Sequence, residues 1–353
     1  MSRGPRNVQA TDRAIASALG RMSVLVLLYH GVRPDDAQPA TTNLQAKHVS
    51  QSAFAAQMDW LIGAGYRFID GDELRWMSKA RSLPRGPAVA ITFDDGYANN
   101  HSCALPVLRP REIPALVFLV GAFVDRGEPL WVDRLEQAVM SARVPELTVD
   151  LNGARRTLTL AGAPARKAAE SSVRSYCKRL PATARESVLQ ELFAGLDAPS
   201  SPLPALYRPL RWDEIDDLRH AGWTIGSHTM THTILAGLTA AQARREVGEA
   251  KALLEARLGV QCDLFAYPNG LRGDFTEETQ RVLAGLGKTC ALASVEGRVT
   301  RRFEPLAMRR VAVHDRMGLA EFKVRTTGAV GVAKSVKAGL RTAQSALRRR
   351  RAG

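Results

Sequence analysis

The sequence is poor in cysteine and in long apolar runs. Its 353 residues contain four cysteines, Cys103, Cys177, Cys262 and Cys290, which are scattered and form no C-x-x-C pair. This spacing excludes a dense disulfide framework, so we expect buried, reduced cysteines. The apolar run Val24–Leu28 is too short for a signal sequence or a membrane span. The sequence therefore predicts a cytoplasmic protein, either free or peripheral on the cytoplasmic face of the membrane.

The chain also lacks a nucleic-acid recognition motif, although its formal net charge is +14. Its basic residues are not interleaved with aromatic ones, so nucleic acid is not an expected partner. Part of the charge falls in the stretch 329–353, where apolar residues recur at helical spacing beside lysines and arginines. This pattern predicts a basic amphipathic tail that contacts an anionic membrane, or a positive surface that attracts an acidic glycan carrier. A solvated surface with a basic tail is the simpler alternative.

Short apolar segments alternate with helical patterns along most of the chain. The segments with strand character are 24–30, 66–69, 88–93, 115–120, 223–227, 264–267, 289–293 and 308–313. The helical patterns between them are 52–64, with Phe54, Met58, Leu61 and Ile62 on one face, 212–221, 239–258 and 276–286. Such alternation predicts an α/β fold, a distorted (β/α)7–8 barrel. An open doubly wound sheet is the alternative, but no glycine-rich phosphate loop follows any strand.

Three regions depart from this alternation. We expect residues 1–21 to be a flexible N-terminal segment, 22–328 to form the barrel domain and 329–353 to form the basic tail. The region from about 131 to 209 interrupts the barrel with helical patterns, a polar alternation and a proline-rich loop. We interpret it as a mainly helical insertion over the barrel mouth, acting as a substrate cap. A peripheral elaboration without contact to the substrate is the alternative.

Two polar clusters at strand ends point to chemistry. The apolar segment 90–93 ends in Asp94-Asp95-Gly96, and 223–226 leads into Ser227 and two histidines four residues apart, His228 and His232. A buried carboxylate without a partner is costly, so two acids at a strand end indicate a site. One carboxylate and two imidazoles form a common ligand set for a divalent metal that keeps positions open. With the second aspartate as a base, these residues predict metal-assisted hydrolysis.

These two clusters, with a third segment, resemble the motifs of a known family. The segments are Thr92-Phe93-Asp94-Asp95-Gly96, Ser227-His228-Thr229-Met230-Thr231-His232 and Phe265-Ala266-Tyr267-Pro268-Asn269-Gly270. They are similar to the first three motifs of the polysaccharide deacetylases, which form carbohydrate esterase family four. The resemblance extends over about 24–322 and is weak in 131–209. The resemblance implies a distorted β/α barrel that removes N-acetyl groups from amino sugars of a cell-envelope glycan or a lipid-linked precursor. It also implies a divalent metal cofactor, zinc first, with cobalt, nickel or iron as alternatives.

The resemblance assigns roles to individual residues. Asp95, His228 and His232 would hold the metal, and Asp94 would be the general base. The general acid of the family lies in a Leu-x-His motif near the C-terminus, whereas this chain has Leu28-Tyr29-His30 at the end of its first strand. In a closed barrel the first and last strands are neighbours, so the chain resembles the circularly permuted poly-N-acetylglucosamine deacetylases. His30 is therefore the expected acid, and His314, after the last strand, is the alternative.

The third motif departs from the family pattern. Its usual arginine is absent near Phe265, and we expect Arg310 on the last strand either to orient Asp94 instead or to lie at the surface. Asn269 stands where the family has a tyrosine. Tyr267, Pro268 and Asn269 remain the expected substrate and oxyanion residues, because the backbone N–H of Asn269 can still stabilise an oxyanion.

Three other functions fit part of this pattern. A non-haem iron oxygenase also uses two histidines and a carboxylate, but it leaves Asp94 and His30 without a role. A glycoside hydrolase would pair Asp94 with Asp95, but adjacent strand residues point to opposite faces. A catalytically weak or inactive carbohydrate-binding relative is the main alternative. The complete set of ligands, acid and base favours the hydrolase.

Overall fold

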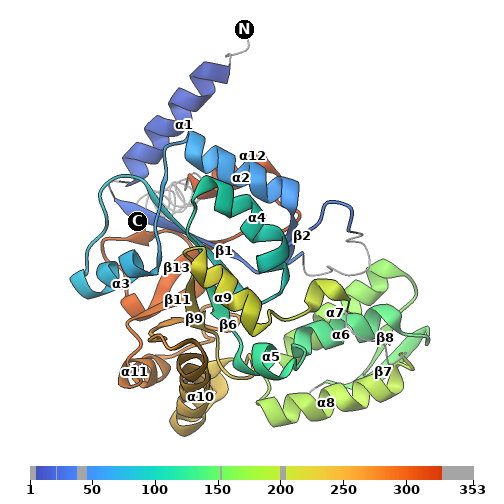
Figure 1. Cartoon of the computed structure of the whole chain (residues 1–353). Coiled ribbons are helices and arrows are strands. Elements are labelled where there is room, and N and C mark those ends of the chain that lie inside the picture. Colours follow the sequence, from blue (N-terminus) through green and yellow to red (C-terminus); the bar gives the residue numbers. More distant parts are fainter. Residues whose placement is uncertain (1–4, 21, 38–45, 152, 199–203, 328–353) are drawn as a thin grey trace, which may run out of the picture.

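The computed structural model describes residues 5–20, 22–37, 46–151, 153–198 and 204–327 (Figure 1). The predicted basic tail, 329–353, lies outside the described residues. All four cysteines are buried and free, as expected. Among the helices of the described ranges, none is long and apolar enough to cross a membrane.

Seven parallel strands of the described residues form a closed ring, which confirms the predicted α/β barrel. In ring order they are β1 (Ser23–Tyr29), β5 (Ala88–Asp95), β6 (Leu116–Leu119), β9 (Thr224–Ser227), β10 (Leu264–Ala266), β11 (Cys290–Glu296) and β13 (Met308–Ala312). Every residue of β1 and β5 is buried, as a parallel strand covered on both faces requires. β1 pairs with both β5 and β13, so the strand that ends before His30 closes the ring.

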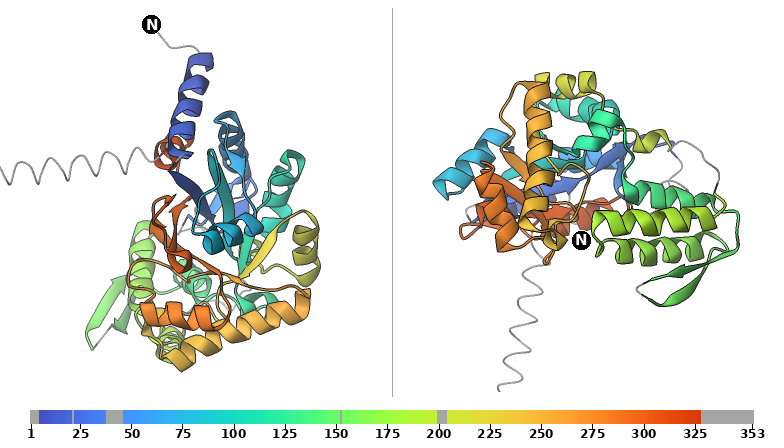
Figure 2. Two further views of the ribbon diagram at one scale, coloured as in Figure 1. Left: turned by 90° about the vertical axis from the view of Figure 1, so that its left-hand side faces the viewer. Right: turned by 90° about the horizontal axis from the view of Figure 1, so that it is seen from below.

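Helices surround this ring on the outside (Figure 2). They are α2 (Gln51–Gly63), α3 (Gly71–Ala80), α4 (Leu105–Leu108), α5 (Gly121–Arg126), α9 (Trp212–His220), α10 (Ala240–Leu258), α11 (Glu277–Gly285) and α12 (Leu319–Thr326). α10 has the predicted ends: Thr239 accepts a hydrogen bond from the Gln242 backbone N–H, and Gly259 terminates the helix with φ of 64°. The prediction that Ile62 belongs to the buried face of α2 is wrong. Ile62 is 44% exposed, because it lies at the edge of that face.

Short strands complete the sheet system. β2 (Gly31–Arg33) pairs in parallel with β3 (His48–Ser50), β4 (Arg67–Phe68) extends β5, and β12 (Val299–Thr300) runs antiparallel to β1. After β5 the chain forms a π-helical turn, Asn100–Ala104. Of these additions only β4 was predicted, within the segment 66–69; the others have two- to five-residue lengths that leave no clear periodicity.

The N-terminal segment differs from its prediction. Instead of being loosely structured, it contains helix α1 (Pro5–Gly20). Its C-terminal half packs on the barrel domain: Ala16 is buried, the Trp60 indole N–H donates to Asp12, and the Arg13 guanidinium donates to the Gly63 carbonyl. These contacts supply the partners that the local sequence pattern did not reveal.

The insertion forms a separate lobe beside the barrel, at the lower right of Figure 1. It contains α6 (Trp131–Ser141), β7 (Glu146–Asp150), β8 (Arg155–Thr159), α7 (Ala163–Cys177) and α8 (Ala182–Gly195). These elements pack around an apolar cluster that also includes Tyr97, Val120 and Phe123 of the barrel domain. The expectation of a mainly helical insertion is met, and the polar alternation within it is the antiparallel hairpin β7–β8. α6 and the end of α7 contribute residues to the cavity described next, so the insertion is not merely peripheral.

Candidate active site and metal centre

A cavity of about 310 Å³ lies at the carboxyl ends of the barrel strands, against the insertion. From the barrel and its loops, the cavity is lined by His30, Lys47, Asp94, Asp95, His228, His232 and Asn269. From the insertion, it is lined by Trp131, Val132, Arg174 and Lys178. Most of the site residues predicted from distant motifs therefore share one cavity.

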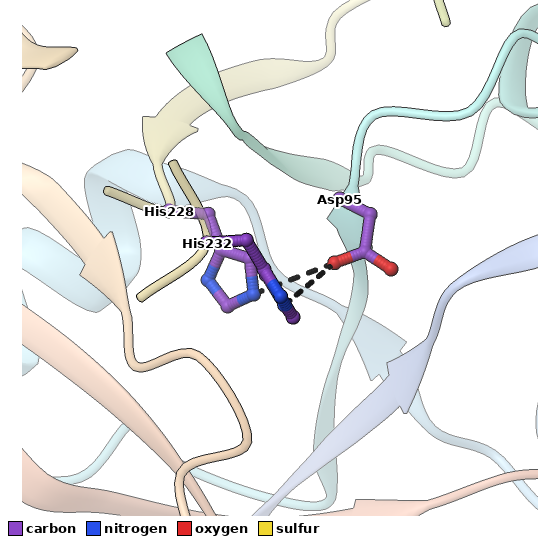
Figure 3. A group of neighbouring side chains, drawn as sticks. All are labelled: Asp95, His228 and His232. Carbon is purple, nitrogen blue, oxygen red and sulfur yellow. Dashed lines mark ion pairs between the residues drawn. The ribbon is translucent and has the colours of Figure 1, made fainter. Parts of the chain in front are cut away.

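Asp95, His228 and His232 point toward one another (Figure 3). The Asp95 Oδ1 atom lies 3.5 Å from His228 Nε2 and 3.3 Å from His232 Nε2. The three potential ligand atoms all lie within 4.8 Å of one another. The Nδ1–H of His228 donates a 2.7 Å hydrogen bond to the Ala266 carbonyl, which orients the imidazole and leaves Nε2 facing Asp95.

The backbone around these side chains is unusual. Eight non-glycine residues of the described ranges have φ in the left-handed region, and four of them lie in the motifs: Asp95, Thr229, His232 and Asn269. Such conformations cost energy in residues with a Cβ atom, and they collect where a surrounding structure must aim functional side chains. This clustering supports a functional role for the motifs, and it does so independently of which residue types the motifs contain.

The donor set fits a divalent metal ion. Asp95 Oδ1 and His232 Nδ1 are buried, and neither has a hydrogen-bond partner among the described residues. Burial alone would raise the pKa of Asp95, but the nearby His232 and the charges of Lys47 and His30 hold it well below its usual value. An ionised carboxylate beside two imidazole nitrogens, with acceptor capacity unused, matches the chemistry of a borderline cation such as zinc.

Asp94 is held by Arg310. The guanidinium donates two hydrogen bonds, 2.8 Å and 2.7 Å long, to the two carboxylate oxygens of Asp94. Arg310 is fully buried, and it also donates to the Ala293 carbonyl and the Thr92 hydroxyl. Burial alone would raise the pKa of Asp94, but Arg310 and His228 lower it below its usual value, so the carboxylate is ionised near pH 7. The sequence left two positions open for Arg310, either beside Asp94 or at the surface. In the structure Arg310 lies beside Asp94.

The two candidate general acids differ in position. His30 follows β1 and lines the cavity, and burial lowers its pKa to about 4 despite the raising charges of Asp95 and Asp94. His314 follows β13 and is not among the residues that line the cavity; its backbone carbonyl accepts a hydrogen bond from Met317. The geometry therefore favours His30.

The third motif contributes one residue to the cavity. Asn269 lines it, and among the described residues none accepts a hydrogen bond from its backbone N–H. Tyr267 instead packs in the core, with its ring stacked 4.3 Å from Phe275 and its hydroxyl donating to the Leu306 carbonyl. Neither Tyr267 nor Pro268 is among the lining residues. Of this predicted trio, only Asn269 therefore faces the site.

A buried network beside the candidate metal ligands was not predicted. The Lys47 ammonium donates to Asp133 at 2.8 Å and to the Tyr97 hydroxyl at 2.6 Å, and it lies 3.8 Å from Asp95 Oδ2. The Tyr97 hydroxyl donates to the other oxygen of Asp133. Burial alone would lower the pKa of Lys47, but Asp133 and Asp95 raise it above its usual value. Because Asp133 belongs to α6, this network connects the insertion to the metal centre. No motif surrounds Lys47 in the sequence, so local pattern could not identify it.

Comparison with known proteins agrees with this architecture. The family model of polysaccharide deacetylases matches residues 82–291. YxkH of Bacillus subtilis is 29% identical over 132 residues, 36% of this chain and 44% of that protein. A poly-β-1,6-N-acetyl-D-glucosamine N-deacetylase of Staphylococcus aureus is 29% identical over 109 residues, 29% of this chain and 37% of that protein. The match thus spans less than half of either relative.

A solved structure extends the likeness of fold beyond the family-model match. IcaB from Ammonifex degensii superposes with a TM-score of 0.56 at 20% identity, over 87% of this chain and 97% of that one. At this identity the superposition establishes the shared fold. Since the family model covers more than half of the chain, the protein belongs to the polysaccharide deacetylase family.

Proposed function

We propose that the protein is a metal-dependent hydrolase that removes N-acetyl groups from amino sugars. The observation that carries the proposal is the convergence of Asp95, His228 and His232 in one cavity with an ionised Asp94. This arrangement provides a metal-binding face and a separate base, the two components that amide hydrolysis by water needs.

The ligand set would be Asp95, His228 and His232. When bound there, a divalent ion, zinc first, supplies Lewis acidity to the acetamide carbonyl and to a nearby water. Asp94, oriented by Arg310, takes the proton from the attacking water. The backbone N–H of Asn269 stabilises the developing oxyanion.

His30 donates a proton to the departing amine nitrogen. With its pKa near 4 the free imidazole is neutral at pH 7, so it takes up this proton from solvent as negative charge develops on the reacting acetamide, and Asp94 later releases the proton of the water to solvent. The C–N bond then breaks, and acetate and a free amino sugar leave the site.

The substrate class follows from the relatives. The S. aureus relative is named for deacetylation of a polymer of β-1,6-linked N-acetylglucosamine. We extend this to the present chain as an N-acetylated glycan of the cell envelope or its lipid-linked precursor, processed at the cytoplasmic face of the membrane. A catalytically inactive carbohydrate-binding protein is the alternative, and the presence of ligands, base and acid in one cavity argues against it.

Acetate release tests the proposal. The zinc-loaded protein is incubated with N-acetylglucosamine oligomers and N-acetylated glycolipids, beside Asp94→Asn. We expect acetate from at least one substrate and a loss of at least about 10²-fold in kcat for the variant, the range of general-base catalysis. No acetate from any substrate, or full activity of Asp94→Asn, would refute the proposal.

A further inference from the structure

The last turn of α7 brings a lysine into the candidate active site. Lys178 follows α7 directly, and its ammonium donates a hydrogen bond to the side-chain carbonyl of Asn269, the third-motif residue that faces the cavity. Asn269 in turn donates to Asp274. A residue of the insertion thus lies beside the group proposed to stabilise the oxyanion.

Lys178 also lies where two cavities meet. The cavity that contains the proposed metal ligands and a second one of about 240 Å³ share Lys178 and Ile234 among their lining residues. The second cavity runs along the insertion and the loops of the barrel, and Arg179 and Asp274 also line it. The second space therefore adjoins the candidate active site at Lys178.

The other cations of the catalytic cavity have carboxylate partners. Lys47 is paired with Asp133, and Arg174 is paired with the buried Glu170. Each pair neutralises its own charge within the site.

Lys178 differs from them. Within the described parts of the chain, no carboxylate oxygen lies within salt-bridge distance of its ammonium, and its hydrogen-bond acceptor is a neutral amide. Burial lowers the pKa of Lys178 to about 8, with Arg174 and Lys47 acting in the same direction and the more distant Asp274 and Glu170 opposing them. A partly buried ammonium without an anion in direct contact is unfavourable, and an anion supplied by a ligand would remove that cost.

We propose that Lys178 recognises an anionic group, a phosphate or a carboxylate, on the sugar unit next to the acetamide that is cleaved. The inference rests on the proposed deacetylase function and deepens it, because it makes the substrate an acidic glycan or a glycosyl phosphate. The hydroxyl groups of an uncharged oligomer could accept hydrogen bonds from Lys178, but they would not neutralise its positive charge.

The test compares three N-acetylglucosamine substrates of matched length. One is neutral, one carries a phosphate ester on the neighbouring position, and one has a hexuronic acid as the neighbouring sugar. For the zinc-loaded wild type we expect kcat/KM to be at least tenfold higher for one acidic substrate than for the neutral one, mainly through KM. Comparison of kcat/KM for the phosphate and hexuronate substrates shows which anion the site prefers.

Substitutions at two positions of the same segment separate recognition from general charge. Lys178→Met should bring the ratio of acidic to neutral kcat/KM close to one, and Lys178→Arg should retain most of it. Lys167→Met is the matched control, since it removes the same charge from α7 about 16 Å along the helix and lies outside both cavities. It should leave the ratio unchanged. A wild-type ratio near one, or an equal fall in Lys167→Met, would overturn the inference while leaving the deacetylase function intact.

Binding gives a second readout that does not need turnover. Calorimetric titration of N-acetylglucosamine 1-phosphate into the zinc-loaded wild type and Lys178→Met should show at least fivefold weaker binding by the variant. Equal affinities would reject the role of Lys178 even if none of the three substrates were hydrolysed.

Discussion

Arg310 and Asp94 form a buried two-point ion pair, although they lie on strands that do not touch. Arg310 is on β13 and Asp94 is on β5, and β1 lies between them in the ring. The two hydrogen bonds fix the plane of the carboxylate and keep it ionised, which is the state that a general base requires.

Removing this arginine should affect both folding and activity. Arg310→Met leaves the Asp94 charge buried and unpaired, so we expect the free energy of unfolding to fall by about 3–5 kcal/mol. We also expect kcat/KM to fall at least about 10²-fold, because a misoriented base loses most of its contribution. Denaturant unfolding and steady-state kinetics measure the two effects. The double variant Arg310→Met/Asp94→Asn should recover stability but not activity, and recovery of both would contradict this account.

The metal centre can be tested without turnover. Asp95→Asn should bind zinc much more weakly than the wild type, because a neutral amide replaces the anionic ligand. In the wild type, zinc at 100 times its dissociation constant should stabilise the fold by about 2.7 kcal/mol. Metal content after gel filtration and the zinc-dependent shift in melting temperature report this. His101→Gln, which changes a histidine paired with Asp217 outside the cavity, should bind zinc normally. Unchanged zinc binding by Asp95→Asn would count against the site.

Substitution of each candidate histidine tests which one is the general acid. His30→Gln should lower kcat by at least about 10²-fold with little loss of zinc, as expected for removal of a proton donor. His314→Gln should remain close to the wild type, since His314 does not line the cavity. The reverse pattern would assign the acid to His314.

The lysine network should stabilise the contact between insertion and barrel. Lys47→Met leaves Asp133 buried without its cation, so we expect a loss of about 3–5 kcal/mol in the free energy of unfolding. Lys47→Met/Asp133→Asn should regain part of this loss. Limited proteolysis within the insertion, faster in the single variant, would show which part opens. Equal stability of wild type and Lys47→Met would argue against the network.

The preference for acidic substrates should depend on pH. Lys178 has a pKa of about 8, so its charge is present below pH 8 and is lost above it. The selectivity ratio should therefore fall between pH 7 and pH 9. In Lys178→Arg it should stay constant, since the pKa of arginine exceeds about 12. The other charges acting on Lys178 are Arg174, Asp274, Lys47 and Glu170. Kinetics on the neutral and phosphorylated substrates across this range provide the measurement, and a flat wild-type ratio would exclude Lys178 as the titrating group.

Much of the barrel followed from local pattern. The apolar runs of β1, β5 and β13, and the capped helix α10, were predicted close to their observed bounds because each pattern lies within one contiguous segment. The pair β2–β3 and the helix α1 were missed, since they depend on partners elsewhere in the chain. The hairpin β7–β8 is local, and the sequence showed it only as a polar alternation.

Local sequence is enough to indicate the chemistry of the chain, because Asp94-Asp95 and the His228/His232 pair each lie within a few residues at a strand end. The arrangement of these groups depends on how the whole chain folds. Arg310 reaches Asp94 across 216 positions, Lys47 reaches Asp133 across 86, and Lys178 reaches Asn269 across 91. Such pairings arise when the ring closes and the insertion packs against it, and no periodicity within a segment encodes which distant charges will meet.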